Sequence, residues 1–378
     1  MSLLPLLHGL IAPDPARLRA WAAQAADDPA WVAWLNAQGL AAYAFYGLRQ
    51  AGAFQALPVR AQTALSQAGY AAIARAELQS RRLAEALDAL TAAGVTAVLL
   101  KGAALASSVY PDPACRPMGD FDLWVSAAEM APSQAALERL GYVQHIKAER
   151  PPALQALHLG EIQMIAPPAA GGGLVELHWG VFPGVWLQQI AAVPEAELRA
   201  RAVPIVAAGR PALALAPEDA VIHVAVHLAV NHQMAAPWLR GLLDMALLAR
   251  GGVDWLAITE RAQAWRVATA VWLPLHLAAG LLGLTEAAPA LARLRPPAGR
   301  RWLLGRFANG PSLLAMRNLT LGPGRFVYQL LLADRWRAAA RLLYRGVWPT
   351  DDWLALRHGR SGLAARAQHL AGALRGRV

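Results

Sequence analysis

Apolar residues recur at every third or fourth position through the first 93 residues, which is the spacing of one face of a helix. The clearest segments read ARLRAWAAQAA and ARAELQSRRLAEALDALTAAG. The second segment ends at Gly94, and glycine is the residue best suited to end a helix. The pattern therefore predicts an N-terminal helical region over residues 1–93.

After Gly94 the chain changes to short apolar runs separated by turns and helices. Strands are predicted where β-branched residues gather or apolar and polar residues alternate, at residues 95–100, 120–125 and 174–179, and more weakly at 142–146 and 161–165. Helices are predicted between them, one ending near residue 109 and one over 127–140. The alternation predicts an α+β domain over residues 94–215, built on a mixed sheet with flanking helices.

Helical spacing returns after Pro217. Glu218 and Asp219 follow this proline, and the helix dipole favours acidic residues in a first turn. The helical pattern continues to about residue 290, and further helices are expected from there to the end. We therefore expect a C-terminal helical domain over residues 216–378.

Two carboxylates lie close together on the strand predicted at residues 120–125. Asp120 and Asp122 are two positions apart, so their side chains point to one face while Phe121 points to the other. Neighbouring like charges repel unless a cation lies between them, and Mg²⁺ prefers such oxygen ligands. Glu176, on the later strand LVELHW, supplies a third acid for the same site.

A phosphate-binding element is predicted just before this acidic strand. Lys101 and Gly102 stand where a buried strand passes into a helix, and helix N-termini offer unpaired N–H groups to phosphate. Lysine occurs only at positions 101 and 147, whereas arginine carries the rest of the positive charge. The two residues are not interchangeable, so the retained Lys101 points to a chemical role.

The segments LKGAAL, YPD, DFDLWV and VELHW resemble the nucleotidyltransferase superfamily, which includes polymerase-beta-like and aminoglycoside nucleotidyltransferases. More narrowly, they resemble a bacterial group of uncharacterised nucleotidyltransferases. The resemblance implies a nucleotidyltransferase fold and assigns roles to the matching residues: Asp120, Asp122 and Glu176 as catalytic metal ligands, and Lys101, Gly102, Ala103 and Arg116 as nucleotide contacts. Gly102-Ala103 departs from the usual Gly-Ser or Gly-Gly of the superfamily.

These residues favour an Mg²⁺-dependent enzyme, with Mn²⁺ as the other ion, that moves a nucleoside monophosphate from a nucleoside triphosphate to an acceptor and releases pyrophosphate. The expected acceptor is a small molecule, a sugar or a peptide. A precursor of a peptide or of a polysaccharide is one such acceptor. The departure at Gly102-Ala103 motivates an alternative, a non-catalytic nucleotide-binding or scaffold protein. A basic module that binds nucleic acid or a membrane surface is the third hypothesis.

Three further histidines and one acid lie near these motifs or on the later helices. His178 shares a strand face with Glu176, where it would orient substrate or a carboxylate, or serve as a buried structural residue. His223 and His227 are four positions apart but lack the glutamate of the H-E-x-x-H zinc motif, which favours packing or substrate-facing roles. Asp244, within the apolar segment WLRGLLDMALL, must be paired if buried, and we expect it to brace the helical domain against an arginine or a histidine, or to face the acceptor.

Positive charge is concentrated late in the chain. The formal net charge is +10, and about 16 arginines against three acids follow residue 292. Aromatic-rich strand motifs of RNA-binding domains are missing there, which disfavours nucleic acid; peripheral membrane contact and a solvated helical face remain as alternatives. The single cysteine excludes a disulfide framework, and a cytoplasmic location is expected because no apolar stretch reaches the length of a membrane span.

Overall fold

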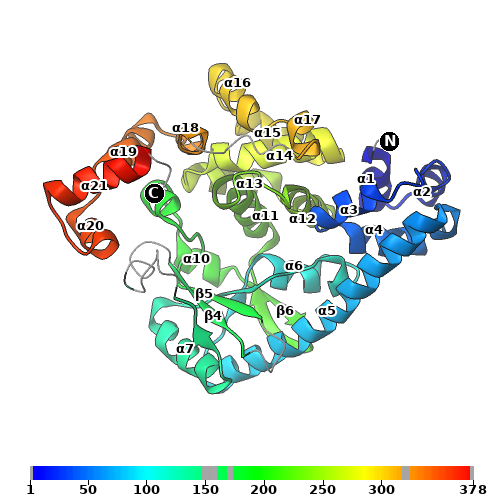
Figure 1. The fold of residues 1–378 in the computed structure, drawn as a ribbon, viewed down its shortest axis with the longest axis horizontal. Coiled ribbons are helices and arrows are strands. Elements are labelled where there is room, and N and C mark those ends of the chain that lie inside the picture. The colour runs from blue at the N-terminus through cyan, green and yellow to red at the C-terminus, as the bar shows by residue number, and fades with distance from the viewer. Residues whose placement is uncertain (1–2, 147–152, 154–159, 168–172, 317–322, 375–378) are drawn as a thin grey trace.

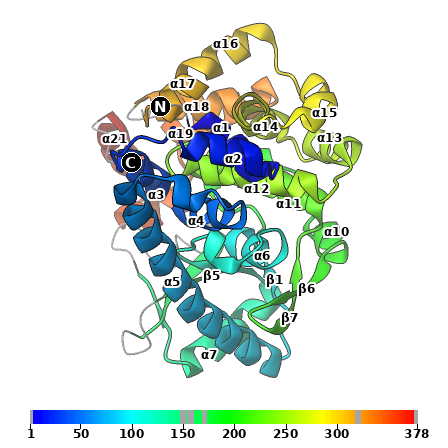
Figure 2. The ribbon, with the colours of Figure 1, turned by 90° about the vertical axis from the view of Figure 1, so that its right-hand side faces the viewer.

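In the computed structural model, residues 3–146, 153, 160–167, 173–316 and 323–374 are described. A sheet lies at the bottom of Figure 1, and helices from both terminal regions lie above it. Figure 2 shows the same two layers from the side, with one long helix running past both. The predicted α+β fold, a mixed sheet with helical regions at both ends, is confirmed.

Within the described residues, the sheet has seven strands in the order β3-β4-β5-β2-β1-β7-β6. Their bounds are β1 (Val98–Leu99), β2 (Phe121–Trp124), β3 (Val143–Gln144), β4 (Glu161–Ile165), β5 (Leu174–His178), β6 (Val203–Ala207) and β7 (Arg210–Ala214). The pairs β2–β5 and β1–β7 are parallel, and the other neighbours are antiparallel. Helix α6 (Lys101–Ser108) follows β1 directly, and α7 (Met130–Arg139) follows β2 after the short 3-10 helix η3 (Ala127–Glu129).

Most predicted strands are confirmed, but β1 and β3 have only two residues each and the β6–β7 hairpin was missed. The hairpin turns at Ala208 and Gly209, whose φ angles of 52° and 71° lie in the left-handed region typical of tight hairpins. Its strands contain Pro204 and Pro211, residues that argue against a strand in sequence. The structure tolerates Pro204 because β6 is the edge of the sheet.

The N-terminal region consists of helices packed against the later helices of the chain. Its members are α1 (Leu4–Ile11), α2 (Pro15–Ala22), α3 (Ala30–Ala37), α4 (Ala41–Gln50) and α5 (Val59–Ala92). Buried residues of α1 to α4 belong to the same hydrophobic core as buried residues of the helices after residue 216. The division into three domains stays a prediction. In the structure, the first and last of these parts share one hydrophobic core.

Helix α5 links this core to a second one beneath the sheet. Leu65 packs in the upper core, whereas Leu87 and Leu90 pack in the lower core with α7 and one face of the sheet. At 34 residues, α5 is about 50 Å long, enough to span both. Near its middle, Gly69 allows close packing, since an added Cβ would lie 2.4 Å from the Phe45 ring.

The helices that come after β5 cover the upper face of the sheet and then extend away from it. The first are α9 (Val185–Ile190), α10 (Glu195–Ala200), α11 (Pro217–Val226), the π-helix η5 (His227–Asn231), α12 (Trp238–Arg250), α13 (Trp255–Ala264) and α14 (Ala268–Leu282). The later ones are α15 (Ala288–Arg293), α16 (Ala298–Phe307), α17 (Gly310–Leu314), α18 (Pro323–Leu332), α19 (Trp336–Val347), α20 (Asp351–His358) and α21 (Leu363–Leu374). Among the described helices, none combines the length and the apolar character needed to cross a membrane.

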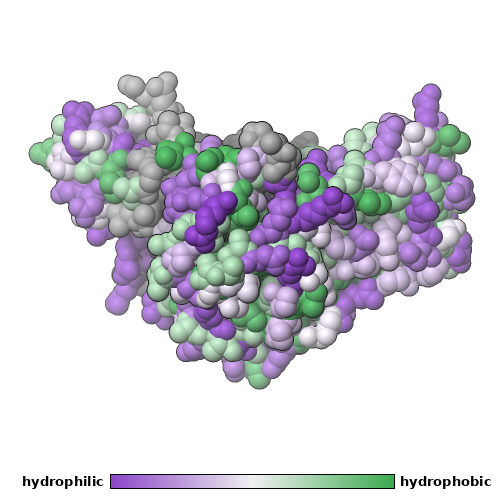
Figure 3. All heavy atoms as spheres, turned by 90° about the horizontal axis from the view of Figure 1, so that it is seen from below, coloured by the Kyte–Doolittle hydropathy of each residue, from purple (hydrophilic) through white to green (hydrophobic). Residues whose placement is uncertain are grey.

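Seen from below, the side where α7 and the end of α5 lie, hydrophilic and hydrophobic side chains are interspersed over the surface (Figure 3). The opposite face of the sheet is covered by α11 and its neighbours. Trp124 of β2 is buried on this face and belongs to the same core as buried residues of α11. Polar side chains on this face, such as Asp122 and His178, are therefore buried between the strands and the helical layer.

Candidate functional site

Strand register brings the acidic residues together on the upper face of the sheet. In the parallel pair β2–β5, Asp122 stands beside Glu176 and Trp124 beside His178. In the antiparallel pair β4–β5, Gln163 stands beside Glu176. Side chains at paired positions share a face, so these residues form one cluster, whereas Phe121 and Leu123 point down into the lower core.

The cluster holds a group of ligand atoms suited to a divalent cation. One atom from each of Asp122, Glu176 and His178 lies within 4.8 Å of the others. His178 Nε2 is 2.9 Å from Asp122 Oδ1 and 3.7 Å from Glu176 Oε2. His178 Nδ1 is buried and makes no hydrogen bond to the described residues, its nearest carboxylate being Glu161 at 3.4 Å. Two carboxylates and an imidazole fit a divalent metal.

Lys101 is part of the same cluster. Its ammonium lies 2.5 Å from Asp122 Oδ1, and both side chains are nearly buried. The backbone of Lys101 has φ of 45°, a left-handed conformation that lysine rarely adopts, at the junction between β1 and α6. The Leu100 N–H donates to the Asp122 carbonyl at 3.0 Å, which holds this junction against β2. Strain of this kind is concentrated at functional sites.

The charges of the cluster perturb one another. Burial raises the pKa of Glu176, and the nearby Glu161 and Asp122 carboxylates add to this effect, so that its pKa is about 7. Burial opposes ionisation of Asp122 as well, but Lys101 and His178 outweigh it and hold its pKa well below the ordinary value. For Lys101 burial is again outweighed, and Asp122 and Glu176 raise its pKa. The cluster therefore has an ionised pair and a glutamate poised to change charge near neutral pH.

Asp120 lies just before β2, at the margin of the cluster. Burial raises its pKa, and the Asp122 carboxylate raises it further, so the two charges interact. Asp120 is not among the three residues whose ligand atoms lie within 4.8 Å of one another. Its predicted role as a metal ligand remains a prediction.

Gly102 and Ala103 occupy the first turn of α6 and are buried. A Cβ at Gly102 would lie 2.7 Å from Arg116 Nη1 and 2.9 Å from Met118 Cγ. Glycine is therefore needed here to let the loop before β2 approach the helix. The predicted contact of this turn with phosphate stays a prediction.

Arg116 lies against Asp244. Its Nε donates to Asp244 Oδ1 at 2.9 Å and its Nη2 to Oδ2 at 2.8 Å, while the Tyr110 hydroxyl donates to Oδ1 at 2.7 Å. This buried network ties the loop before β2 to α12, as predicted for Asp244 as a brace against an arginine. Asp244 uses both of these guanidinium donors, so they are not free to bind phosphate.

Three histidines approach the cluster from the helical layer. The His223 and His227 rings are 6.4 Å apart, and those of His227 and His232 are 4.6 Å apart. Burial lowers the pKa of His223 to about 3 and that of His232 to about 4, and the charge of Lys101 lowers both further. These histidines are neutral at neutral pH. His227 is the first residue of the π-helix η5 and His232 follows its last residue, and such irregular turns are common near functional sites.

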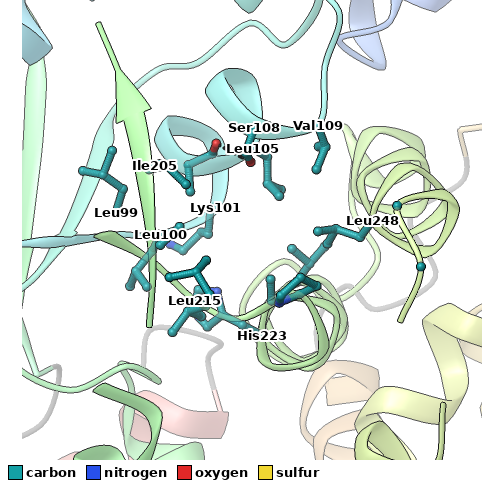
Figure 4. A pocket seen from close by; sticks show the side chains of 18 residues that line it. Leu99, Leu100, Lys101, Leu105, Ser108, Val109, Ile205, Leu215, His223 and Leu248 are labelled. Carbon is teal, nitrogen blue, oxygen red and sulfur yellow. Dashed lines mark hydrogen bonds between the residues drawn. The ribbon is translucent and has the colours of Figure 1, made fainter. Parts of the chain in front are cut away.

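A cavity of about 240 Å³ lies beside the cluster, between the start of α6 and α11. Figure 4 shows Lys101 and His223 on its wall, with Leu100, Leu105 and Leu215 around them. Asp122 and Glu176 do not line it, and most of its wall is apolar. The cavity is thus a neighbour of the acidic cluster and is separated from it by Lys101.

Glu161 and Gln163 belong to the cluster but were not predicted as site residues. Gln163 Nε2 donates to Glu176 Oε1 at 2.6 Å, and Glu161 faces His178. The sequence signal for them is the alternation in EIQMI, which places both polar residues on one strand face. That signal identifies the face only when the neighbouring strand is known.

Acidic side chains gathered beside a lysine at the start of a helix, on a mixed sheet, form the kind of centre that serves transfer of phosphorus groups. The chain belongs to a family described as uncharacterised nucleotidyltransferase, whose model matches residues 24–283. The family name indicates nucleotidyltransferase activity in general and implies a nucleoside triphosphate as substrate. No curated protein and no solved structure matches the chain.

Proposed function

We propose that the chain is an Mg²⁺-dependent nucleotidyltransferase that moves a nucleoside monophosphate from a nucleoside triphosphate to an acceptor. The observation that carries the proposal is the group formed by Asp122, Glu176 and His178 beside Lys101. Membership of the family supports the same reaction. The acceptor is proposed to be a small molecule, a sugar or a peptide.

The proposed roles follow from position and charge. Asp122 and Glu176, with Asp120 at the margin, would hold the cation, and Mn²⁺ is the alternative ion because carboxylates suit Mn²⁺ as well as Mg²⁺. A bound divalent cation neutralises charge on the phosphates and orients the donor. Lys101, at the start of α6, would contact the triphosphate together with the backbone of Gly102 and Ala103.

In the proposed reaction the acceptor oxygen attacks the α-phosphorus, and the bond from that phosphorus to the pyrophosphate oxygen breaks. The acceptor hydroxyl loses its proton to a carboxylate. Glu176 is proposed for this step because its carboxylate stands beside Asp122 on the neighbouring strand. His178 is buried against Asp122 and would keep the Asp122 carboxylate oriented.

The test is pyrophosphate release from each nucleoside triphosphate with Mg²⁺ or Mn²⁺, in the presence of sugar, peptide and small-molecule acceptors. We expect release that depends on the cation and stops with a chelator. Absence of release with every triphosphate and acceptor would contradict catalysis. Nucleotide binding that persists in such a protein would favour a binding role instead.

A non-catalytic nucleotide-binding or scaffold protein is the second proposal. Two observations favour it: Lys101 already neutralises Asp122, and Gly102 is packed against Arg116 and Met118. In that case Asp122→Asn would leave nucleotide binding unchanged. In the enzyme, the same substitution would weaken cation-dependent binding of the triphosphate.

Cation affinity is expected to depend on pH. The pKa of Glu176 is raised, so its protonated form favours the fold, and this stabilising contribution is lost as pH rises through about 7. A cation competes with that proton, so binding of Mg²⁺ or Mn²⁺ should weaken roughly tenfold from pH 8 to pH 6. The thermal midpoint measured with and without cation at both pH values checks this. Equal cation-induced shifts at pH 6 and pH 8 would contradict it, and Glu176→Gln should remove the difference.

A further inference from the structure

Helices α18 and α19 expose aromatic and aliphatic side chains to solvent. Trp336 is 73% exposed, Tyr344 57% and Leu343 48%. Val347 and Trp348 continue this surface, and Phe326 and Val327 of α18 are exposed as well. Large apolar side chains that gather on one exposed surface mark a binding site more often than isolated ones do.

The side chains of α19 fall into three sectors around the helix. With about 100° between successive residues, Trp336, Leu343 and Val347 lie on one exposed stripe. Arg337, Arg341 and Arg345 follow at intervals of four and form a second exposed stripe beside it. The third sector faces the protein through the buried Leu342. The apolar stripe is therefore not the packing face of the helix.

Charge in this region is almost entirely positive. The described residues from 323 to 348 contain five arginines and one acid, Asp334. The Asp334 carboxylate accepts from the backbone N–H groups of Ala268 and Thr269 at 2.7 and 2.8 Å, so its charge is used to cap α14. Arg337 lies over the Trp336 ring at 5.5 Å and Arg345 over the Tyr344 ring at 5.7 Å. The exposed stripes of α19 thus combine arginine with aromatic rings.

We propose that α18 and α19 form a docking surface for an anionic membrane, on which α19 lies in the plane of the interface. An interfacial helix buries an apolar stripe at the level of the acyl chains and directs arginines to anionic headgroups, and tryptophan and tyrosine are favoured at that depth. The stripe of Trp336, Leu343 and Val347 would enter the lipid. Arg337, Arg341 and Arg345 would contact the headgroups.

Two hydrogen bonds join α18 to the rest of the protein. The buried Tyr328 hydroxyl of α18 donates to the Ala229 carbonyl of η5 at 2.9 Å, and Trp186 Nε1 of α9 donates to the Gln329 carbonyl at 2.9 Å. Docking through α19 would therefore attach the helical layer, which carries His227, to the lipid surface. Helices α18 and α19 lie beyond residue 283, outside the part matched by the family model, so this surface is not implied by family membership.

The experiment is sedimentation of the whole protein with vesicles, in about 0.1 M salt. One set contains phosphatidylcholine alone, and the other contains phosphatidylcholine with about 30% phosphatidylglycerol. We expect binding to the anionic vesicles and little to the neutral ones. Replacement of Arg337, Arg341 and Arg345 by glutamate should reduce binding on the order of 100-fold or more, since each basic residue contributes about fivefold near such a surface. The double variant with Trp336→Ala and Val347→Ala should also reduce vesicle binding, and by the same factor at every salt concentration.

A matched control is offered by three exposed arginines of α5, Arg60, Arg75 and Arg81, replaced by glutamate. This control carries the same charge change and should keep most of the binding. Equal loss in both triple variants would overturn the proposal, because net charge alone would then explain the attraction. It would also be overturned if the protein failed to sediment with anionic vesicles, or if the α19 changes abolished self-association or RNA binding instead. The readout needs no enzymatic activity, so its failure would leave the proposed reaction untouched.

Discussion

Asp122→Asn is expected to reduce nucleotidyl transfer by about 100-fold to 1,000-fold, the effect of removing one preorganised charged group from an active site. The asparagine keeps the shape of the side chain but not its charge, so the cation would lose a ligand. The Lys101 ammonium, 2.5 Å from Asp122 in the wild-type protein, would also lose its counter-charge. Pyrophosphate release measured at saturating Mg²⁺ checks the prediction.

Because Asp122→Asn leaves a buried ammonium unpaired, a loss of activity could reflect damage to the fold. Glu176→Gln separates the two effects. Glu176 has a raised pKa, so removal of its charge should not destabilise the protein, and Gln163 can still donate to the new side-chain carbonyl. We expect this variant to melt at or above the wild-type temperature and to be inactive. Asp88→Asn, the same change in an exposed ion pair with Arg210, should be fully active. Wild-type rates in Glu176→Gln would remove this residue from the reaction.

Asp244→Ala is expected to destabilise the protein by about 3–5 kcal/mol, the usual effect of breaking a buried ion pair by removing one partner. The change would leave the Arg116 guanidinium and the Tyr110 hydroxyl buried without their carboxylate. The loop before β2 would lose its tie to α12, so the acidic cluster should loosen as well. Urea denaturation of the variant and the wild type measures the loss.

The matched control for this experiment is Asp88→Ala. Asp88 makes two hydrogen bonds to Arg210, as Asp244 does to Arg116, but that pair is exposed to solvent. Exposed ion pairs contribute little to stability. We expect Asp88→Ala to unfold at nearly the same urea concentration as the wild type. We expect Asp244→Ala to unfold at a clearly lower one. If the two variants behaved alike, burial of the Arg116–Asp244 pair would not explain its contribution.

The site strands could be predicted from the sequence because their side chains alternate strictly. In DFDLWV and LVELHW the polar residues recur at every second position, so Asp120 and Asp122 were assigned to one face of the first strand, and Glu176 and His178 to one face of the second. The prediction that these strands meet rested on the family resemblance. The parallel register that sets Asp122 beside Glu176 is a tertiary property, and neither segment encodes it alone.

Other features depend on contacts between distant segments. Arg116 and Asp244 are 128 positions apart, so the sequence showed that a buried Asp244 needed a partner without showing which one. The ammonium of Lys101 was expected at phosphate, and its pairing with Asp122 follows from β1 lying next to β2. The β6–β7 hairpin was missed because its prolines contradict strand patterning. The conflict is removed for Pro204 by the edge position of β6, and for Pro211 because β7 pairs with β1 only at Leu213 and Ala214.

The length of α5 has a consequence for how the molecule comes apart. One unbroken helix supplies Leu65 to the core shared by the terminal regions and Leu87 to the core under the sheet. A fragment that starts after residue 93 would lack one wall of the lower core, and a fragment that ends there would expose the same leucines to water. A proteolytic cut in the middle of α5 should therefore release no independently folded piece, and the two layers should melt in one transition.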